Sequence, residues 1–118
     1  MTKTNEYDLE ERTEIFAKNV RYFIKKLPKD MIVFEDGKQV VRSSGSVGAN
    51  YIEANEALSK KDFVHRIKIC RKEAKETRYW LKLLDMSNNK ELEKSKERLV
   101  TEATELMKIF GAIVQKST

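Results

Sequence analysis

The chain has 118 residues, which suits one domain and leaves too little for two domains of ordinary size. Charged residues make up 36% of it and hydrophobic residues 40%, with only four glycines and one proline, a composition that fits long helices and disfavours a β-rich fold. The net charge is +5, the single cysteine excludes an intrachain disulfide, and no apolar run is long enough to span a bilayer.

The first predicted helix runs from Asp8 to Leu27. Its apolar positions step by four and three residues, which is the seam of an amphipathic helix that packs as in a coiled coil. The seam consists of Leu9, Thr13, Phe16, Val20, Phe23 and Leu27. Asp8 is placed to cap the start, and Pro28 ends the helix because a proline inside it would cost about 3 kcal/mol. Residues 1–7 are expected to form a flexible tail.

The next segment, residues 30–58, has the same helical spacing. Its seam consists of Val33, Val40, Ser44, Val47, Tyr51, Ala54 and Leu58. Gly37 weakens the first part of this pattern, because glycine disfavours helix interiors, so we expect the helix to begin near Lys38.

The stretch RSSGSVGAN, residues 42–50, has two interpretations. A phosphate-binding loop would need a lysine after its glycines, which is missing, and the GXXG of a nucleic-acid-clamping KH domain would need a sheet, for which no strand pattern is present. The alternative is a helix whose small residues let a neighbour approach closely, and the spacing across the glycines favours it. If residues 59–61 connect the second and third helices and these run antiparallel, residues at equal distances in sequence from this connection face each other. The count places Gly48 against the Cys70–Ala74 turn, Ser44 against Glu76 and Thr77, and Val41 against Trp80.

A third helix is predicted after Ser59, which with Asp62 resembles a capping box. Its seam consists of Phe63, Ile67, Cys70, Ala74, Thr77, Leu81 and Leu84. Cys70 lies on this seam, so we expect it to be a small core residue and not a nucleophile. His65, the only histidine, has no ligand partner at helical spacing and is expected to be solvated.

One segment of the third helix carries the whole basic excess of the chain. Residues 60–82 hold nine basic and three acidic side chains, a net charge of +6, while the rest of the chain sums to −1. Steps of three and four residues gather Lys68, Arg71, Lys75, Arg78 and Lys82 on one face, with Lys72 at its flank. Such a face can bind nucleic-acid phosphates without reading sequence. It can also be a solvated face that pairs with carboxylates of the fourth helix, such as Glu102 and Glu105.

Two carboxylates of the third helix, Glu73 and Glu76, lie beside its seam. A pair on one face can serve acid–base chemistry or hold a metal. No His or Asp joins them at ligand spacing, which favours a polar layer that accepts hydrogen bonds from the second helix. The donors available to this layer are Arg42, Ser43, Ser44 and Asn50. We therefore expect no catalytic residue, no metal and no cofactor.

Two neighbouring aromatic residues, Tyr79 and Trp80, lie near the end of the third helix. Both have rings that can stack on nucleic-acid bases. The helical spacing places Trp80 on the packed side of the helix, whereas Tyr79 points elsewhere and is expected to be exposed.

The fourth helix is predicted after a turn and cap at Ser87–Asn89. Its seam, interrupted by Lys96, consists of Leu92, Leu99, Ala103, Leu106, Phe110 and Ile113. Residues 116–118 are expected to form a C-terminal tail. The four segments together predict an all-α, up-down-up-down antiparallel four-helix bundle, a single domain over residues 8–115.

Several motifs resemble the signatures of one family. Arg42-Ser43, Ser46 to Tyr51 and Glu53-Ala54 follow the pattern R-S-x-x-S-[IV]-G-A-N-x-x-E-A of the "four helix bundle protein" family, first noticed as reading frames in intervening sequences of bacterial large-subunit ribosomal RNA genes. The matches elsewhere are Asp8-Leu9, Arg12-Thr13, Asp62-Phe63, Lys72-Glu73-Ala74, Glu76-Thr77 and Tyr79-Trp80-Leu81. Two departures are Gly45, where alanine or threonine is commoner, and Met31–Gly37, which is unlike the usual start of the second helix.

The resemblance implies a four-helix bundle that assembles with itself as a ring of five and has no established enzymatic activity. The chain is also similar to a related branch, the accessory variability proteins of diversity-generating retroelements. These share the fold and the ring, and they bind nucleic acid beside a reverse transcriptase. RNA or DNA is therefore an implied partner.

Two functional hypotheses remain open. One is nucleic-acid binding through the basic face of the third helix. The other is an oligomeric scaffold for a protein partner with no nucleic-acid role, in which small residues of the second helix and apolar positions beside the seams form the subunit interface. No constellation of residues supports an enzyme. Because no signal-peptide pattern is present, we expect a cytoplasmic protein without membrane contact.

Overall fold

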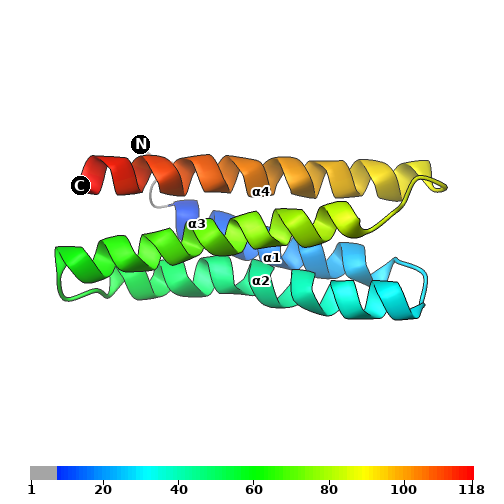
Figure 1. Cartoon of the computed structure of the whole chain (residues 1–118), viewed down its shortest axis with the longest axis horizontal. Helices are drawn as coiled ribbons and strands as arrows, with labels where there is room; N and C mark the ends of the chain where they lie inside the picture. The colour runs from blue at the N-terminus through cyan, green and yellow to red at the C-terminus, as the bar shows by residue number, and fades with distance from the viewer. Residues whose placement is uncertain (1–7) are drawn as a thin grey trace.

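The computed structural model describes residues 8–118, and this part of the chain consists of four helices without a strand. The helices are α1 (Asp8–Lys25), α2 (Met31–Asn55), α3 (Lys60–Leu83) and α4 (Lys90–Ser117). Each helix runs antiparallel to the one before it, so the connections alternate between the two ends of a bundle of 46 × 29 × 19 Å (Figure 1). The predicted all-α four-helix bundle is confirmed.

The last three helices each begin at a capping side chain. The side-chain oxygens accept backbone N–H groups of the first turn: Asp30 from Val33 at 2.8 Å, Ser59 from Asp62 at 3.0 Å, and Asn89 from Leu92 at 3.1 Å. These bonds satisfy donors that have no partner within their own helix. The caps predicted at Ser59 and in the Ser87–Asn89 turn are confirmed.

The start expected for the second helix near Lys38 is wrong, because α2 begins at Met31. The Asp30 cap fixes the first turn, and Gly37 is buried inside the helix. A Cβ atom at Gly37 would lie 3.6 Å from Cγ2 of Ile24, so this turn packs on α1. That packing and the cap offset the helix penalty of one glycine, which is only about 1 kcal/mol.

The predicted seams form the core of the bundle. All six residues of the first predicted seam are buried, including Leu27, which follows α1, and so are most of those of the other three seams. Val33, Phe63 and Ile113 are partly buried. Leu58 was expected on the seam of the second helix but is 100% exposed. Since α2 ends at Asn55, Leu58 lies in the connection and no longer follows the helical repeat.

Lys96 interrupts the apolar seam of α4 for a structural reason. Its Nζ donates a hydrogen bond of 2.7 Å to the carbonyl oxygen of Leu84, the residue that caps the end of α3. A cation at the C-terminus of a helix satisfies a free carbonyl and complements the helix dipole. The polar residue therefore ties α4 to the end of α3.

The helix ends differ from expectation at the C-terminus. α1 ends at Lys25, two residues before the end predicted at Leu27, and does not reach Pro28. α4, in contrast, continues to Ser117, although residues 116–118 were expected to form a tail. The hydroxyls of Ser117 and Thr118 donate to backbone carbonyls one turn earlier, at 2.8 and 3.1 Å, which supports the last turn. The tail expected at residues 1–7 and the cap expected of Asp8 lie outside the described side chains.

The helices do not pack equally. α3 packs extensively on both α2 and α4, whereas α1 and α4 pack together least. The bundle is therefore open along one side, between its first and last helices. Within residues 8–118, no helix is long and apolar enough to cross a membrane.

Candidate nucleic-acid interface

The basic face of α3, formed by the six residues predicted to bind nucleic acid, lies on the surface. Lys68, Arg71, Lys72, Lys75 and Lys82 are exposed, and Arg78 is half-buried. None of the ion pairs formed among residues 8–118 involves any of the six. The positive charge of this face is therefore available to an external partner.

The two arginines of the basic face lean against α4. Nη1 of Arg78 donates to the hydroxyl of Thr104 at 3.3 Å. The side chain of Arg71 lies beside Gly111, where a Cβ atom would come within 3.8 Å of Arg71 Nε. The face thus contains one arginine that is hydrogen-bonded to α4, Arg78, and five cations that are exposed to solvent.

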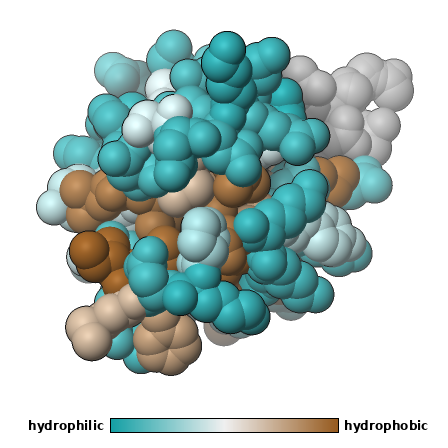
Figure 2. All heavy atoms as spheres, turned by 90° about the vertical axis from the view of Figure 1, so that its right-hand side faces the viewer, coloured by the Kyte–Doolittle hydropathy of each residue, from teal (hydrophilic) through white to brown (hydrophobic). Residues whose placement is uncertain are grey.

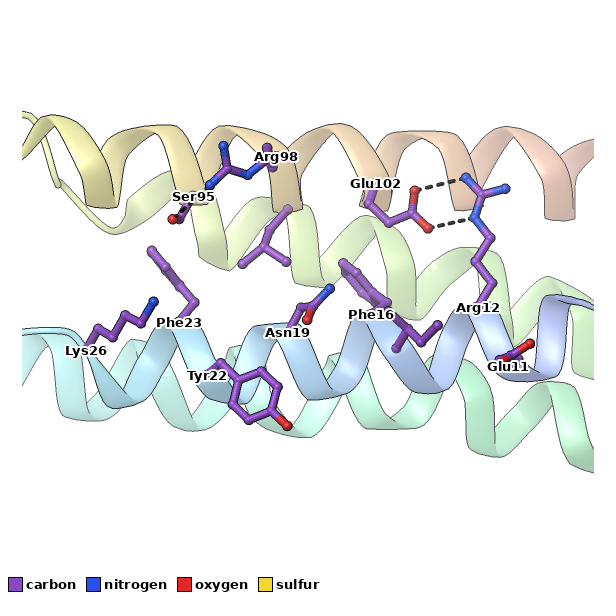
Figure 3. Close-up of a pocket in the computed structure, with 12 residues that line it drawn as sticks. Glu11, Arg12, Phe16, Asn19, Tyr22, Phe23, Lys26, Ser95, Arg98 and Glu102 are labelled. Carbon is purple, nitrogen blue, oxygen red and sulfur yellow. Dashed lines mark hydrogen bonds and ion pairs between the residues drawn. The ribbon is translucent and has the colours of Figure 1, made fainter.

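The carboxylates of α4 do not neutralise the basic face. Glu102, a possible partner of this face in the alternative interpretation, forms a two-bond ion pair with Arg12 of α1, at 2.7 and 2.9 Å (Figure 3). Those hydrogen bonds raise the pKa of Arg12 above its ordinary value. Glu105, the other possible partner, pairs with Lys108 of its own helix. The alternative in which the basic face pairs with carboxylates of α4 is therefore contradicted for these two residues.

The open side of the bundle is a groove of about 680 Å³ between α1 and α4. Phe16, Phe23 and Leu99 contribute apolar lining, and the Arg12–Glu102 pair spans the two helices across it (Figure 3). Its polar side chains form no cluster of nucleophile and base, and Tyr22 points away from α4. We assign no chemistry to this groove.

A buried polar layer joins α2 to α3. Thr77 Oγ1 lies 2.7 Å from Ser43 Oγ, and it also donates to the carbonyl of Glu73 at 2.8 Å. Ser43 therefore faces Thr77, where Ser44 had been expected. Ser44 is buried too, but it donates to Val41 in its own helix. At this level of the bundle, the predicted pairing of α2 with α3 differs from the structure by one residue.

The two carboxylates of α3 meet one cation from α2. Nη2 of Arg42 lies 3.0 Å from Glu76 Oε1 and 3.6 Å from Glu73 Oε1. The Glu73 side chain is only 10% exposed, and its Oε1 has no hydrogen-bond partner among the described residues. The role predicted for Arg42 in this layer agrees with the geometry, whereas Asn50 lies elsewhere: its Oδ1 accepts a bond of 3.2 Å from Arg66.

The remaining reactive residue types are isolated. His65 is exposed, and within residues 8–118 no three His, Cys, Asp or Glu side chains are grouped to hold a metal ion. Cys70 is buried in the core, and this burial raises the pKa of its thiol to about 12. A thiol with that pKa stays protonated at neutral pH and is a poor nucleophile. The geometry of these residues supports no catalytic chemistry.

The model of one protein family, described as 23S rRNA-intervening sequence protein, matches residues 5–112. The chain belongs to this family. It is also similar to a crystal structure from Bacteroides thetaiotaomicron, described as a protein of unknown function from the S23 ribosomal protein family. The two share 30% sequence identity and a TM-score of 0.75 over 89% of this chain and 96% of the other. No match was found among curated proteins.

In this member of the 23S rRNA-intervening sequence family, the RSSGSVGAN stretch is continuous helix, as predicted. The expected contact of Gly48 with α3 is wrong, because a Cβ atom there would lie 2.8 Å from Thr13 Oγ1 on α1. The stretch holds three helices together: Arg42 and Ser43 face α3, and Gly48 faces α1. Neither family description names an enzymatic activity.

Two features of this family member escaped the sequence analysis. Arg12 and Glu102 are far apart in the chain. The predicted bundle places their helices side by side, but apolar spacing does not show which polar residues meet across them. Arg66 pairs with Asn50 across the α2–α3 connection. The outward counting that pairs Ser43 with Thr77 places Asn50 opposite Cys70, so Arg66 reaches Asn50 from one helical turn away.

Proposed function

We propose that this protein is a non-enzymatic, cytoplasmic nucleic-acid-binding protein that contacts phosphate backbones through the basic face of α3. The observation that carries the proposal is the absence of internal neutralisation. The six cations make no ion pair within residues 8–118. The carboxylates of α3 and α4 that form ion pairs do so with other cationic side chains, such as Arg12 and Arg42. Clustered cations on one helix face attract polyanions and release their counterions on binding.

The geometry supports a backbone contact that is independent of base sequence. Lysines act as mobile point charges, and a guanidinium binds phosphate oxygens with two donors. Arg78 is restrained by its hydrogen bond to Thr104 of α4, so it loses less side-chain freedom on binding than an unsupported arginine would. The family name refers to ribosomal RNA, and the retroelement accessory proteins that the chain resembles bind nucleic acid, so we propose both RNA and DNA as ligands.

Replacing three exposed lysines should remove most of the salt dependence of binding. Five neutralised phosphates give a slope of log K against log salt of about −4.5 on duplex DNA, at about 0.9 per phosphate. The variant Lys68→Gln, Lys72→Gln, Lys75→Gln should reduce the magnitude of this slope by about 2.7. These side chains make no ion pair in the fold, so thermal unfolding should be unchanged. Fluorescence anisotropy at several salt concentrations measures the slope.

The control carries the same charge change at another exposed site: Lys25→Gln, Lys26→Gln and Lys29→Gln. It should leave the slope near that of the unaltered protein. Equal loss in both variants would mean that net charge, and not the α3 face, determines binding. No binding to RNA or DNA at about 50 mM salt would end the proposal and leave the scaffold hypothesis.

A second proposal is self-association, which is compatible with the first. Apolar side chains are exposed at the end of the bundle that carries the α1–α2 and α3–α4 connections, and Figure 2 shows apolar surface among the polar residues there. They are Met31, Ile32, Phe34 and Leu83. Contiguous exposed apolar surface is typical of an interaction site. The number five comes from the family resemblance.

Light scattering should give a mass well above that of the 13.8 kDa chain, and about five times that mass for the ring. Ile32→Glu with Phe34→Glu should shift the mass toward the monomer, because two charges would have to be buried in the interface. Leu58→Glu, a change at a fully exposed residue of the opposite end, is the control. A single monomeric species for the unaltered protein at micromolar concentration would refute a stable ring.

A further inference from the structure

One aromatic side chain interrupts the basic face of α3. Tyr79 is 57% exposed, although tyrosine rings bury large apolar areas when they pack. It lies four residues after Lys75, seven after Lys72 and three before Lys82, and residues at these spacings share one side of a helix. The ring therefore lies between exposed cations of the basic face and is itself accessible to solvent.

A neighbouring ring supports Tyr79. The Trp80 ring contacts it nearly edge-on, with the two centroids 5.2 Å apart and the ring planes at 72°. Trp80 is itself half-buried and packs against the core. A ring that is held by an anchored neighbour loses less conformational freedom when a ligand stacks on it. Tyr79 is therefore both accessible and pre-positioned.

We propose that Tyr79 is a stacking platform for an unpaired base, and that the basic face takes single-stranded nucleic acid in preference to duplex; this inference rests on the proposed function. In a duplex the flat faces of the bases are stacked on each other, so an exposed ring has little to gain. In a single strand each base offers a free face, and aromatic rings set among cations are the usual means of holding it. RNA and DNA single strands both offer bases for stacking and phosphates for ion pairs, so we expect both to bind.

The experiment compares oligo(U) and oligo(dT) of about 20 nucleotides with RNA and DNA duplexes of the same length. Tyr79→Ser should weaken binding to both single strands by at least about fivefold and leave duplex affinity unchanged. Tyr79→Phe keeps the ring and should restore the affinity. The fluorescence of Trp80, the only tryptophan, should change when a single strand binds and not when a duplex binds.

Tyr22 provides a matched control. It is also 57% exposed and is flanked by Lys25 and Lys26, but it lies on α1. Tyr22→Ser should therefore leave all affinities unchanged. The salt slope of the Tyr79→Ser variant should equal that of the unaltered protein, because no cation has been removed.

The outcomes separate this inference from the proposed function. Tighter binding to duplex than to single strand, or an unchanged single-strand affinity in Tyr79→Ser, overturns the stacking role. If the lysine variant still flattens the salt slope in that case, phosphate binding by α3 stands. If neither single strand nor duplex is bound at all, the proposed function itself fails, and the stacking role fails with it.

Discussion

Replacing Gly48 by leucine should destabilise the bundle by about 1–3 kcal/mol or more. A Cβ atom at this position would lie 2.8 Å from Thr13 Oγ1 and 3.2 Å from Thr13 Cβ. Thr13 is buried, and its hydroxyl is held by the carbonyls of Leu9 and Glu10 at 2.8 and 3.0 Å, so it cannot turn away without losing those bonds. The better helix propensity of leucine offsets less than about 1 kcal/mol of this cost. Urea unfolding of the two proteins measures the difference.

Gly37 provides the control for this prediction, because it lies in the same helix with more space around it. Its added Cβ would meet Ile24 at 3.6 Å, which is ordinary van der Waals contact. Gly37→Ala should therefore stabilise the protein by about 0.4–1 kcal/mol, whereas Gly48→Ala should not. Equal changes in stability for Gly37→Ala and Gly48→Ala would show that helix propensity alone, and not the close approach of α1, determines the effect of a substitution at these glycines.

Truncating Phe110 to alanine should cost about 3–5 kcal/mol. The ring is completely buried near the end of α4, and its centroid lies 6.0 Å from that of Tyr51 on α2. Its removal leaves a cavity at the point where the last turns of α4 reach the opposite helix. The free energy of unfolding from urea titration should fall accordingly, and the melting temperature should fall with it.

Phe34 is the matched residue for this second test. It is 64% exposed on α2, with Lys38 Nζ 4.7 Å from its ring centroid. Phe34→Ala should change the stability by no more than about 0.5 kcal/mol in the monomer. A loss at Phe34 as large as that at Phe110 would mean that Phe34 is covered in solution, as self-association through this end would require.

The sequence predicted which residues enter the core better than it predicted which helices they face. Apolar spacing identifies a buried stripe, since every residue turns about 100° from the last. It does not give the crossing angle of two helices, and a small rotation exchanges neighbours. Ser43 therefore meets Thr77 where Ser44 was expected, and Gly48 meets α1 where α3 was expected.

The basic face shows the same limit. Its exposure could be predicted, because Lys68, Lys72 and Lys75 lie off the seam. The partners of the opposing carboxylates could not be predicted. Glu102 and Thr104 are two residues apart on α4 and therefore point to different sides of the helix. Thr104 meets Arg78 on α3, whereas Glu102 meets Arg12 on α1.

The pairing of Glu102 with Arg12 has a consequence for how partners approach. It leaves the excess of positive charge concentrated on the basic face of α3, along one side of an elongated molecule, so the electric field around the protein is asymmetric. A polyanion that diffuses within about one Debye length, roughly 8 Å at physiological ionic strength, is turned toward that side before the surfaces touch. Productive collisions then become more frequent than random orientation allows. The association rate constant, measured by stopped flow, should consequently decrease with added salt much more steeply than the dissociation rate constant increases.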